Sequence, residues 1–272
     1  MEILSRLFQN FFNWEYIAQV LPVMLTAGIW NTLFLTAVSG VLAVVLGVLL
    51  AVMGMSHSRW LRWPARIYTD VLRGIPAILL IVIMGQGLFW LARDVFGTTS
   101  PYPLGITALT LITAAYLGEI FRSGIQSVDV GQSDAARALG FSSGSTMLFV
   151  IIPQGIRRVL PATMNQLIQL IKLSSLVFYL GLQADQREIF RIAQDFASMS
   201  GNQSALTVAA VCYLIITVPL THLVNFIDQR LRDGKRVVVQ DDPLAETGAL
   251  DQPTSTTTPT TGVKPAAKET VS

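Results

Sequence analysis

Long apolar runs, separated by short stretches that hold most of the charged residues, dominate the chain from about residue 28 to residue 227. A helix that crosses a membrane needs roughly 20 mainly apolar residues, because the hydrocarbon layer is about 30 Å thick and backbone polar groups inside it must bond within the helix. The pattern therefore predicts an all-α membrane protein with five transmembrane helices. These predicted spans cover about residues 28–55, 74–92, 104–121, 161–182 and 205–227, the fourth being the least apolar.

The composition agrees with a membrane protein. The chain has 272 residues, of which 52% are hydrophobic and 13% charged, and its mean hydropathy is +0.54, whereas about 25% of a typical soluble domain is charged. The net charge of +2 and the lack of a long Lys/Arg cluster with interleaved aromatic residues argue against nucleic acid as a partner. The single cysteine, Cys212, leaves no internal disulfide and no cysteine-based zinc site, and we expect it to pack as a small hydrophobic residue.

The two ends of the chain differ from its centre. Residues 1–27 are expected to form an N-terminal extracytoplasmic or interfacial segment, without the basic leader and cleavage site of a removed signal peptide. Residues 28–236 are expected to form the transmembrane domain. The tail at residues 237–272 is rich in Thr, Pro and Ala and has little to bury, so it is predicted to be disordered and dispensable for the core activity.

Lysine and arginine residues are unevenly divided between the two sides of the predicted membrane domain. Eleven lie on one side: Arg59, Arg62, Arg66, Arg122, Arg137, Arg157, Arg158, Arg230, Arg232, Lys235 and Arg236. Four lie on the other: Arg6, Arg93, Arg187 and Arg191. Because positive residues are retained on the cytoplasmic side, the N-terminus is predicted to lie outside and the C-terminus in the cytoplasm.

A short block rich in small residues, DAARALGFSS, lies in the cytoplasmic connection between the third and fourth predicted spans. Ser133 is expected to cap a helix whose positive end Asp134 favours, and Gly140 suits the left-handed residue that ends it. A second helix is expected to begin at Ser142 or Ser143. The pattern thus predicts a helix, a glycine corner and a second helix outside the membrane.

Three residues of this block, Ala135, Ala138 and Leu139, form a stripe along one helix face. Because the stripe is mostly alanine, it would let the surface of another protein approach closely. The alternative is a structural hairpin that covers the inner face of the helical bundle.

The run from Ala114 to Ala162 resembles the cytoplasmic-loop region of permease subunits of ATP-binding-cassette (ABC) importers for polar amino acids. That family carries Glu-Ala-Ala, then a glycine, then a proline. The motif stands here as Asp134, Ala135, Ala136, Gly140 and Pro153, with Asp in place of the usual Glu. The resemblance extends over about residues 28–231 and includes LRGIPAILL and LIKLSSL.

This resemblance implies a coupling helix that docks in a groove of a separate ATPase subunit, through Asp134, Ala135, Ala136, Ala138, Leu139 and Gly140. It also implies a second permease subunit, identical or homologous, an extracytoplasmic substrate-binding protein and a place in the bacterial cytoplasmic membrane. The chain has no G-x-x-x-x-G-K-[ST] phosphate loop. We therefore expect no catalytic residue, no metal and no cofactor in this chain, with ATP and magnesium bound by the partner ATPase. The implied substrate is a polar amino acid, with glutamate or glutamine expected and basic amino acids left open.

Polar residues on the fourth predicted span indicate a substrate path. Asn165, Gln169 and Lys172 fall at i, i+4 and i+7, within about 60° of one helix face. An ionisable group at membrane depth costs about 2.5–3.5 kcal/mol, so such a stripe favours a water-filled passage. Ser174 and Ser175 would add hydroxyl donors. The alternative is that Lys172 snorkels to the interface or pairs within the bundle.

Arg73 adjoins Gly74 and Pro76, which favour a local break in the second predicted span. Broken helices at membrane depth tend to line binding sites, so these three residues join the candidate path. The alternative is that Arg73 marks the boundary between membrane and water. In the family an Asp usually follows the fourth-span Lys, and Leu173 stands in that position here.

Two further patterns are explained by structure rather than by a functional role. Glu119 and Arg122 are expected to form a local ion pair rather than a proton relay. Small residues at steps of four in the first span form a ridge that permits close helix packing, within the chain or between chains: Ser39, Ala43, Gly47 and Ala51. A secondary transporter or channel driven by an ion gradient remains the alternative function, but it would not need the block at residues 134–140. A membrane scaffold without transport is a third, and the polar stripe on the fourth span argues against it.

Overall fold

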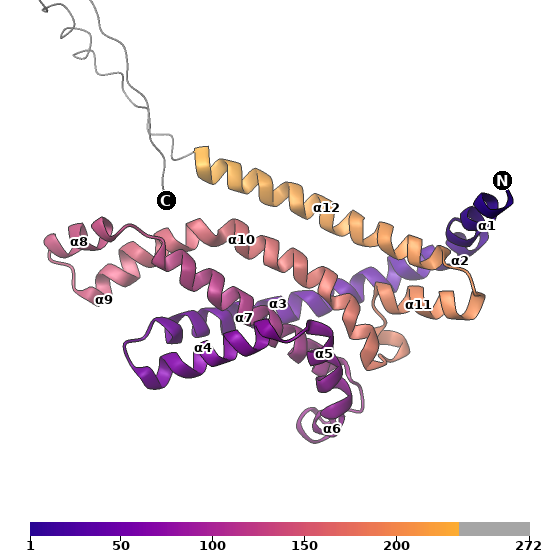
Figure 1. The fold of residues 1–272 in the computed structure, drawn as a ribbon, viewed down its shortest axis with the longest axis horizontal. Coiled ribbons are helices and arrows are strands. Elements are labelled where there is room, and N and C mark those ends of the chain that lie inside the picture. Colours follow the sequence, from indigo (N-terminus) through magenta and orange to yellow (C-terminus); the bar gives the residue numbers. More distant parts are fainter. Residues whose placement is uncertain (234–272) are drawn as a thin grey trace, which may run out of the picture. The chain divides into compact units, whose positions relative to one another are not determined.

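The computed structural model describes residues 1–233, which fold into helices and their connections without a strand (Figure 1). The predicted tail at residues 237–272 lies outside the described residues. The α-helices are α1 Glu2–Phe11, α2 Trp14–Val23, α3 Ile29–Met55, α4 Arg59–Gly74, α5 Ala77–Val82, α6 Phe89–Phe96, α7 Tyr102–Gln126, α8 Val130–Ala138, α9 Ser143–Thr146, α10 Ile152–Leu173, α11 Ile189–Ser200 and α12 Ser204–Asp233. Between them lie the π-helical segments η1 Met24–Gly28, η2 Ile83–Gly87 and η3 Met147–Ile151, and the 3₁₀ segments η4 Ser174–Leu180 and η5 Ala184–Gln186.

Within residues 1–233, three helical runs are long and apolar enough to cross a membrane: Glu2–Met55, Tyr102–Gln126 and Ser204–Arg230. A fourth crossing arises if the bent pair Arg59–Gly74 and Ala77–Gly87 counts as one broken span. The predicted span at residues 161–182 is not among them. It falls on α10 and η4, where the polar residues of the candidate path lower the hydropathy.

The local break predicted at Gly74 and Pro76 is present, and the predicted second span at residues 74–92 is not one continuous helix. Helix α4 ends at Gly74, α5 begins at Ala77, and the two are bent by 104°. Pro76 causes much of this break, because proline has no N–H to donate and disfavours helical backbone in the residue before it. Ile75 accordingly adopts an extended conformation, with φ −85° and ψ 133°.

The predicted start of the first span, at residue 28, falls inside a continuous helical run. Helices α2 and α3 are joined by η1, so the run extends from Trp14 to Met55 without a gap. At about 1.5 Å per residue, this run is roughly twice as long as the hydrocarbon layer is thick. The run therefore extends well beyond the hydrocarbon layer unless it is strongly tilted.

The small-residue ridge of the first span is an internal contact between α3 and α7. Ser39, Ala43 and Gly47 are all buried. A Cβ added to Gly47 would lie 2.9 Å from the Cβ of Leu117, so only glycine allows the two helices to approach this closely. The ridge thus holds the chain's own bundle together.

Helices α7 and α10 cross at a second glycine contact. A Cβ on Gly155 would lie 2.9 Å from the Cα of Ile125 and 3.1 Å from the carbonyl oxygen of Gly124. Both obstacles are backbone atoms, which cannot rotate away as a side chain can. This crossing fixes the start of α10 against the C-terminal end of α7.

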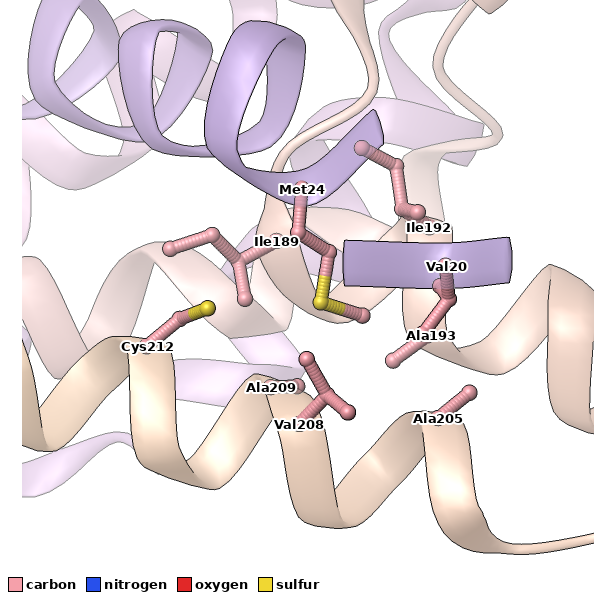
Figure 2. Close-up of a cluster of buried hydrophobic side chains, with 9 residues drawn as sticks. All are labelled: Val20, Met24, Ile189, Ile192, Ala193, Ala205, Val208, Ala209 and Cys212. Atoms are coloured by element: carbon pink, nitrogen blue, oxygen red, sulfur yellow. The ribbon is translucent and has the colours of Figure 1, made fainter. Parts of the chain in front are cut away.

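A buried apolar cluster joins the first helices of the chain to the last ones (Figure 2). Its members come from α2, η1, α11 and α12: Val20, Met24, Ile189, Ile192, Ala193, Ala205, Val208, Ala209 and Cys212. The prediction that Cys212 packs as a small hydrophobic residue is confirmed, since it is buried and unbonded to another cysteine.

Hydrogen bonds fix α1 and α2 at the same end of the bundle as the start of α12. The N–H of Asn13 donates to the Ser204 hydroxyl at 2.8 Å, and the N–H of Gln203 donates to the Asn10 carbonyl at 2.9 Å. Figure 1 shows α1, α2 and α11 at one end of the bundle and α8 with α9 at the other. Helix α11 and the pair α8 and α9 therefore lie at opposite ends of the bundle.

Candidate functional site

Helix α8 begins earlier than predicted. Its cap is Asp129, whose carboxylate accepts a hydrogen bond from the N–H of Gly131 at 2.7 Å. The expectation that Ser133 caps this helix is wrong, because the helix already begins at Val130 and its cap is Asp129. Asp134 consequently lies within the helix rather than in its first turn.

The glycine corner between α8 and α9 is confirmed. Gly140 has φ +88°, its N–H donates to the Arg137 carbonyl at 3.0 Å, and the N–H of Phe141 donates to the Ala136 carbonyl at 3.1 Å. These two bonds form the Schellman arrangement that ends a helix at a left-handed residue. Ser142 then caps α9 by accepting from the N–H of Ser145, as predicted.

Six apolar side chains of α8, the corner and η3 are exposed, and we call them together the corner patch: Val130, Leu139, Phe141, Met147, Leu148 and Phe149. Leu139 is 81% exposed. Asp134, Ala135 and Ala138 are also exposed, whereas Ala136 is only 6% exposed and faces inward. Five of the six predicted coupling residues are therefore exposed within residues 1–233, and Ala136 is buried.

The polar stripe of α10 lies beside a groove. Asn165, Gln169 and Lys172 are all exposed. A groove of about 470 Å³, which we call the α10 groove, is lined by Leu72, Ile75, Ala77, Ile112, Tyr116, Gln166, Gln169, Lys172, Leu173, Ser175 and Leu176. Asn165 does not line it, so the predicted stripe is only partly gathered at this groove.

Lys172 also lines a second hollow, on the side of α11 and α12. This α11 hollow has a volume of about 400 Å³ and is lined by Lys172, Ser175, Phe190, Leu206, Ala209, Ala210 and Tyr213. Among the described side chains no carboxylate lies within 4.0 Å of the Lys172 ammonium. Lys172 and Ser175 therefore stand between two hollows, with the lysine charge unpaired in this part of the chain.

The break between α4 and α5 brings Arg73 close to the α10 groove. The guanidinium carbon of Arg73 lies 5.6 Å from the centre of the Tyr116 ring, and Tyr116 lines the groove. Gly74 and Pro76 are exposed at the break, and their neighbours Ile75 and Ala77 line the groove. The three predicted residues thus lie at or beside its rim.

Ser174 was predicted to line the path, and its position argues against this. It is fully buried, and its hydroxyl donates to the Ile171 carbonyl at 2.7 Å. Ser175, in contrast, is half-buried and lines both hollows while its hydroxyl donates to the Lys172 carbonyl at 2.8 Å. Consecutive residues lie about 100° apart around a helix, so the two serines face different sides.

The expected ion pair between Glu119 and Arg122 is present, with 2.5 Å between a guanidinium nitrogen and a carboxylate oxygen. The pair lines a third cavity of about 290 Å³, together with Arg66 and Asp70 of α4. Within residues 1–233 no group of three or more His, Cys, Asp or Glu side chains is arranged to hold a metal ion.

A buried acid, Glu188, escaped the sequence analysis. It is 0% exposed and caps α11, accepting from the N–H groups of Phe190 and Arg191 at 2.6 Å each. The Tyr213 hydroxyl donates to the same carboxylate at 3.1 Å. Burial raises the pKa of Glu188 to about 7. Glutamate is not among the preferred capping residues, and Tyr213 is distant in sequence, so the pattern gave little signal for this group.

Residues 43–233 match the family described as "Binding-protein-dependent transport system inner membrane component". The chain belongs to this family. It is therefore an inner-membrane protein of a transport system that depends on a binding protein.

Two relatives of this family cover most of the chain. The probable glutamine ABC transporter permease protein GlnM of Bacillus subtilis is 33% identical over 204 residues, covering 75% of this chain and 91% of the relative. The glutamate/aspartate import permease protein GltK of Escherichia coli is 31% identical over 224 residues, covering 80% and 98%. A solved amino acid ABC transporter crystallised with histidines superposes with a TM-score of 0.69 and 32% identity, over 79% of this chain and 96% of the solved one.

Proposed function

We propose that this chain is the transmembrane permease subunit of an ATP-driven importer of polar amino acids. It works with a second permease subunit, identical or homologous, with ATPase subunits that bind ATP and magnesium, and with an extracytoplasmic substrate-binding protein. Membership of the transport family supports this assignment. The two relatives are named for glutamine and for glutamate/aspartate, which favours a polar amino acid as the substrate.

The proposed topology has five crossings, with the N-terminus outside. The first, third and fifth crossings use α3, α7 and α12, the second uses the bent pair α4 and α5, and the fourth uses α10 with η4. In this arrangement residues 28–233 form the membrane domain, and the end of the bundle that carries α8 and α9 lies in the cytoplasm. The excess of Lys and Arg at that end supports this orientation.

The observation that carries the proposal is the corner patch. It joins exposed apolar side chains to a corner whose shape is fixed by the left-handed Gly140 and two backbone hydrogen bonds. An apolar patch on a rigid element that lies outside the lipid indicates a protein partner. We assign the ATPase subunit to this patch, because it is the cytoplasmic partner whose nucleotide-driven movement the permease must receive.

The two hollows that meet at Lys172 form the proposed substrate path. The unpaired ammonium would attract the carboxylate of an amino acid, and Gln169 and Ser175 supply polar contacts beside it. Arg73, held over the Tyr116 ring, adds a second cation at the rim of the α10 groove. The cost of carrying Lys172 at membrane depth is reasonable only if the path holds water or substrate.

The test is reconstitution of the permease with its ATPase and binding protein in proteoliposomes, with ATP-dependent uptake of labelled glutamine, glutamate and arginine as the measurement. Leu139→Arg places a charge on the corner patch and should abolish both co-purification of the ATPase and uptake. Met199→Arg is the matched control, because Met199 is 89% exposed but lies on α11, at the opposite end. Wild-type uptake by the Leu139→Arg complex would contradict the assignment.

A further inference from the structure

Glu188 joins three elements around the α11 hollow. Its carboxylate oxygens accept from the first N–H groups of α11, at Phe190 and Arg191, and from the Tyr213 hydroxyl of α12. The following N–H, that of Ile189, donates to the Thr32 hydroxyl of α3 at 3.2 Å. The start of α11 is therefore held between α3 and α12 by buried polar contacts.

Two of the residues that Glu188 holds are walls of the hollow itself. Phe190 and Tyr213 both line the hollow that contains Lys172 and Ser175. Phe190 also meets the Phe178 ring edge-on, with 5.4 Å between the ring centres. A change at Glu188 would thus alter the shape of the hollow without touching Lys172.

The charge of Arg191 favours the ionised form of the Glu188 carboxylate, but Arg191 also pairs with another acid. Arg191 lies on the same helix as Asp195 and pairs with it at 3.1 Å. Arg187, in the preceding connection, also pairs with Asp195, at 3.3 Å. Helix α12 contributes two titratable side chains to this region, Tyr213 and Cys212. Helix α3 contributes the neutral side chains of Thr32 and Asn31, which bond to residues 185–189. The end of α10 contributes Lys172, which lines the same hollow. Burial thus opposes the ionised form of Glu188, whereas its three hydrogen-bond donors favour it.

We propose that Glu188 is a positioning residue of the substrate path: its ionised carboxylate fixes Phe190 and Tyr213 as the aromatic wall of the α11 hollow, and protonation releases that wall. This inference rests on the proposed transport function. An ionised carboxylate accepts at both oxygens, as the three observed donors require. A protonated one is neutral and turns one oxygen into a donor, so the bonds that Phe190, Arg191 and Tyr213 donate to it become weaker.

The change should occur near neutral pH, because burial raises the pKa of Glu188 to about 7. At that pKa the ionised fraction falls about tenfold between pH 8 and pH 6. Importers must convert ATP hydrolysis into uptake, and a loosened wall would reduce uptake without stopping the ATPase. We therefore expect uptake per ATP hydrolysed to fall severalfold on acidification.

The experiment measures uptake and ATP hydrolysis together in proteoliposomes that contain the permease, its ATPase and its binding protein, from pH 6 to pH 8. The ratio of the two rates removes the pH dependence of the ATPase itself. Glu188→Gln should give a low ratio that no longer changes with pH. Glu15→Gln, at an exposed acid at the same end of the bundle, is the control and should keep the wild-type profile.

Tyr213→Phe gives a second test that leaves the helix cap intact, which matters if Glu188→Gln fails to assemble. It keeps the aromatic ring, removes the hydroxyl bond and should lower the ratio at pH 8 toward the wild-type value at pH 6. A wild-type pH profile in Glu188→Gln, or a wild-type ratio at pH 8 in Tyr213→Phe, would overturn the inference. Failure of the wild-type complex to take up any amino acid would instead count against the proposed function.

Discussion

Replacing Gly140 with valine tests whether the shape of the corner, and not only its apolar surface, is needed for coupling. Gly140 has φ +88°, and a Cβ placed there would have no heavy atom within 4 Å. The substitution therefore causes no clash with neighbouring atoms. Its whole cost is the strain of a β-branched residue in the left-handed region.

That strain is about 1–3 kcal/mol for a residue other than glycine. Because about 1.4 kcal/mol changes an equilibrium constant tenfold, the chain can escape the strain by giving up the corner. Doing so would break the bonds from Gly140 to Arg137 and from Phe141 to Ala136. We expect Gly140→Val to raise the Kd for the ATPase about tenfold to a hundredfold, and Gly140→Asn to fall between valine and wild type, since asparagine tolerates this conformation.

The assay is titration of purified ATPase onto the permease in nanodiscs, followed by uptake per ATP hydrolysed in proteoliposomes. Gly144→Val is the matched control: Gly144 lies in α9, has no heavy atom within 4 Å of an added Cβ and is not among the glycines with positive φ. It should bind the ATPase nearly as wild type does. Unchanged affinity and coupling in Gly140→Val would refute the reasoning, because the strain has no other outlet at this position.

Two further substitutions test the path and the fold. Lys172→Met should reduce uptake at least tenfold while co-purification of the ATPase stays normal, because the charge lies at the two hollows and not at the corner; normal uptake kinetics would remove Lys172 from the path. Gly155→Ala should lower stability by about 1–3 kcal/mol, measured as a reduced Tm in detergent, because the added methyl group meets the backbone of Ile125 at 2.9 Å. Gly144→Ala, in open space, should leave the Tm unchanged.

Features set by local chemistry were predictable from the sequence. Gly140 ends a helix, Ser142 starts the next one, and Glu119 pairs with Arg122 one turn away. Each depends on residues within a few positions along the chain. The long apolar runs of α7 and α12 were found for the same reason, since their hydropathy alone marks them.

Features set by packing between distant segments were not predictable in the same way. Pro76 indicated a break, but nothing in the pattern gives the 104° bend, which depends on how α5 packs against α7 and η4. Glu188 depends on Tyr213, and a single sequence does not show that the two residues meet.

One continuous helical run connects the two candidate sites. It extends from Ser143 at the corner, through η3 and α10, to Leu180 at the end of η4, and from Ser143 to Lys172 it is about 45 Å long at 1.5 Å per residue. In the proposed importer such a run would carry a displacement of the corner toward Lys172, with η3 and Pro161 as the points where it can bend. The crossing at Gly155 fixes it against α7, so this glycine would act as a pivot. In the proposed importer, a small shift of the ATPase at one end would therefore move the lysine against a hollow whose opposite wall Glu188 holds in place.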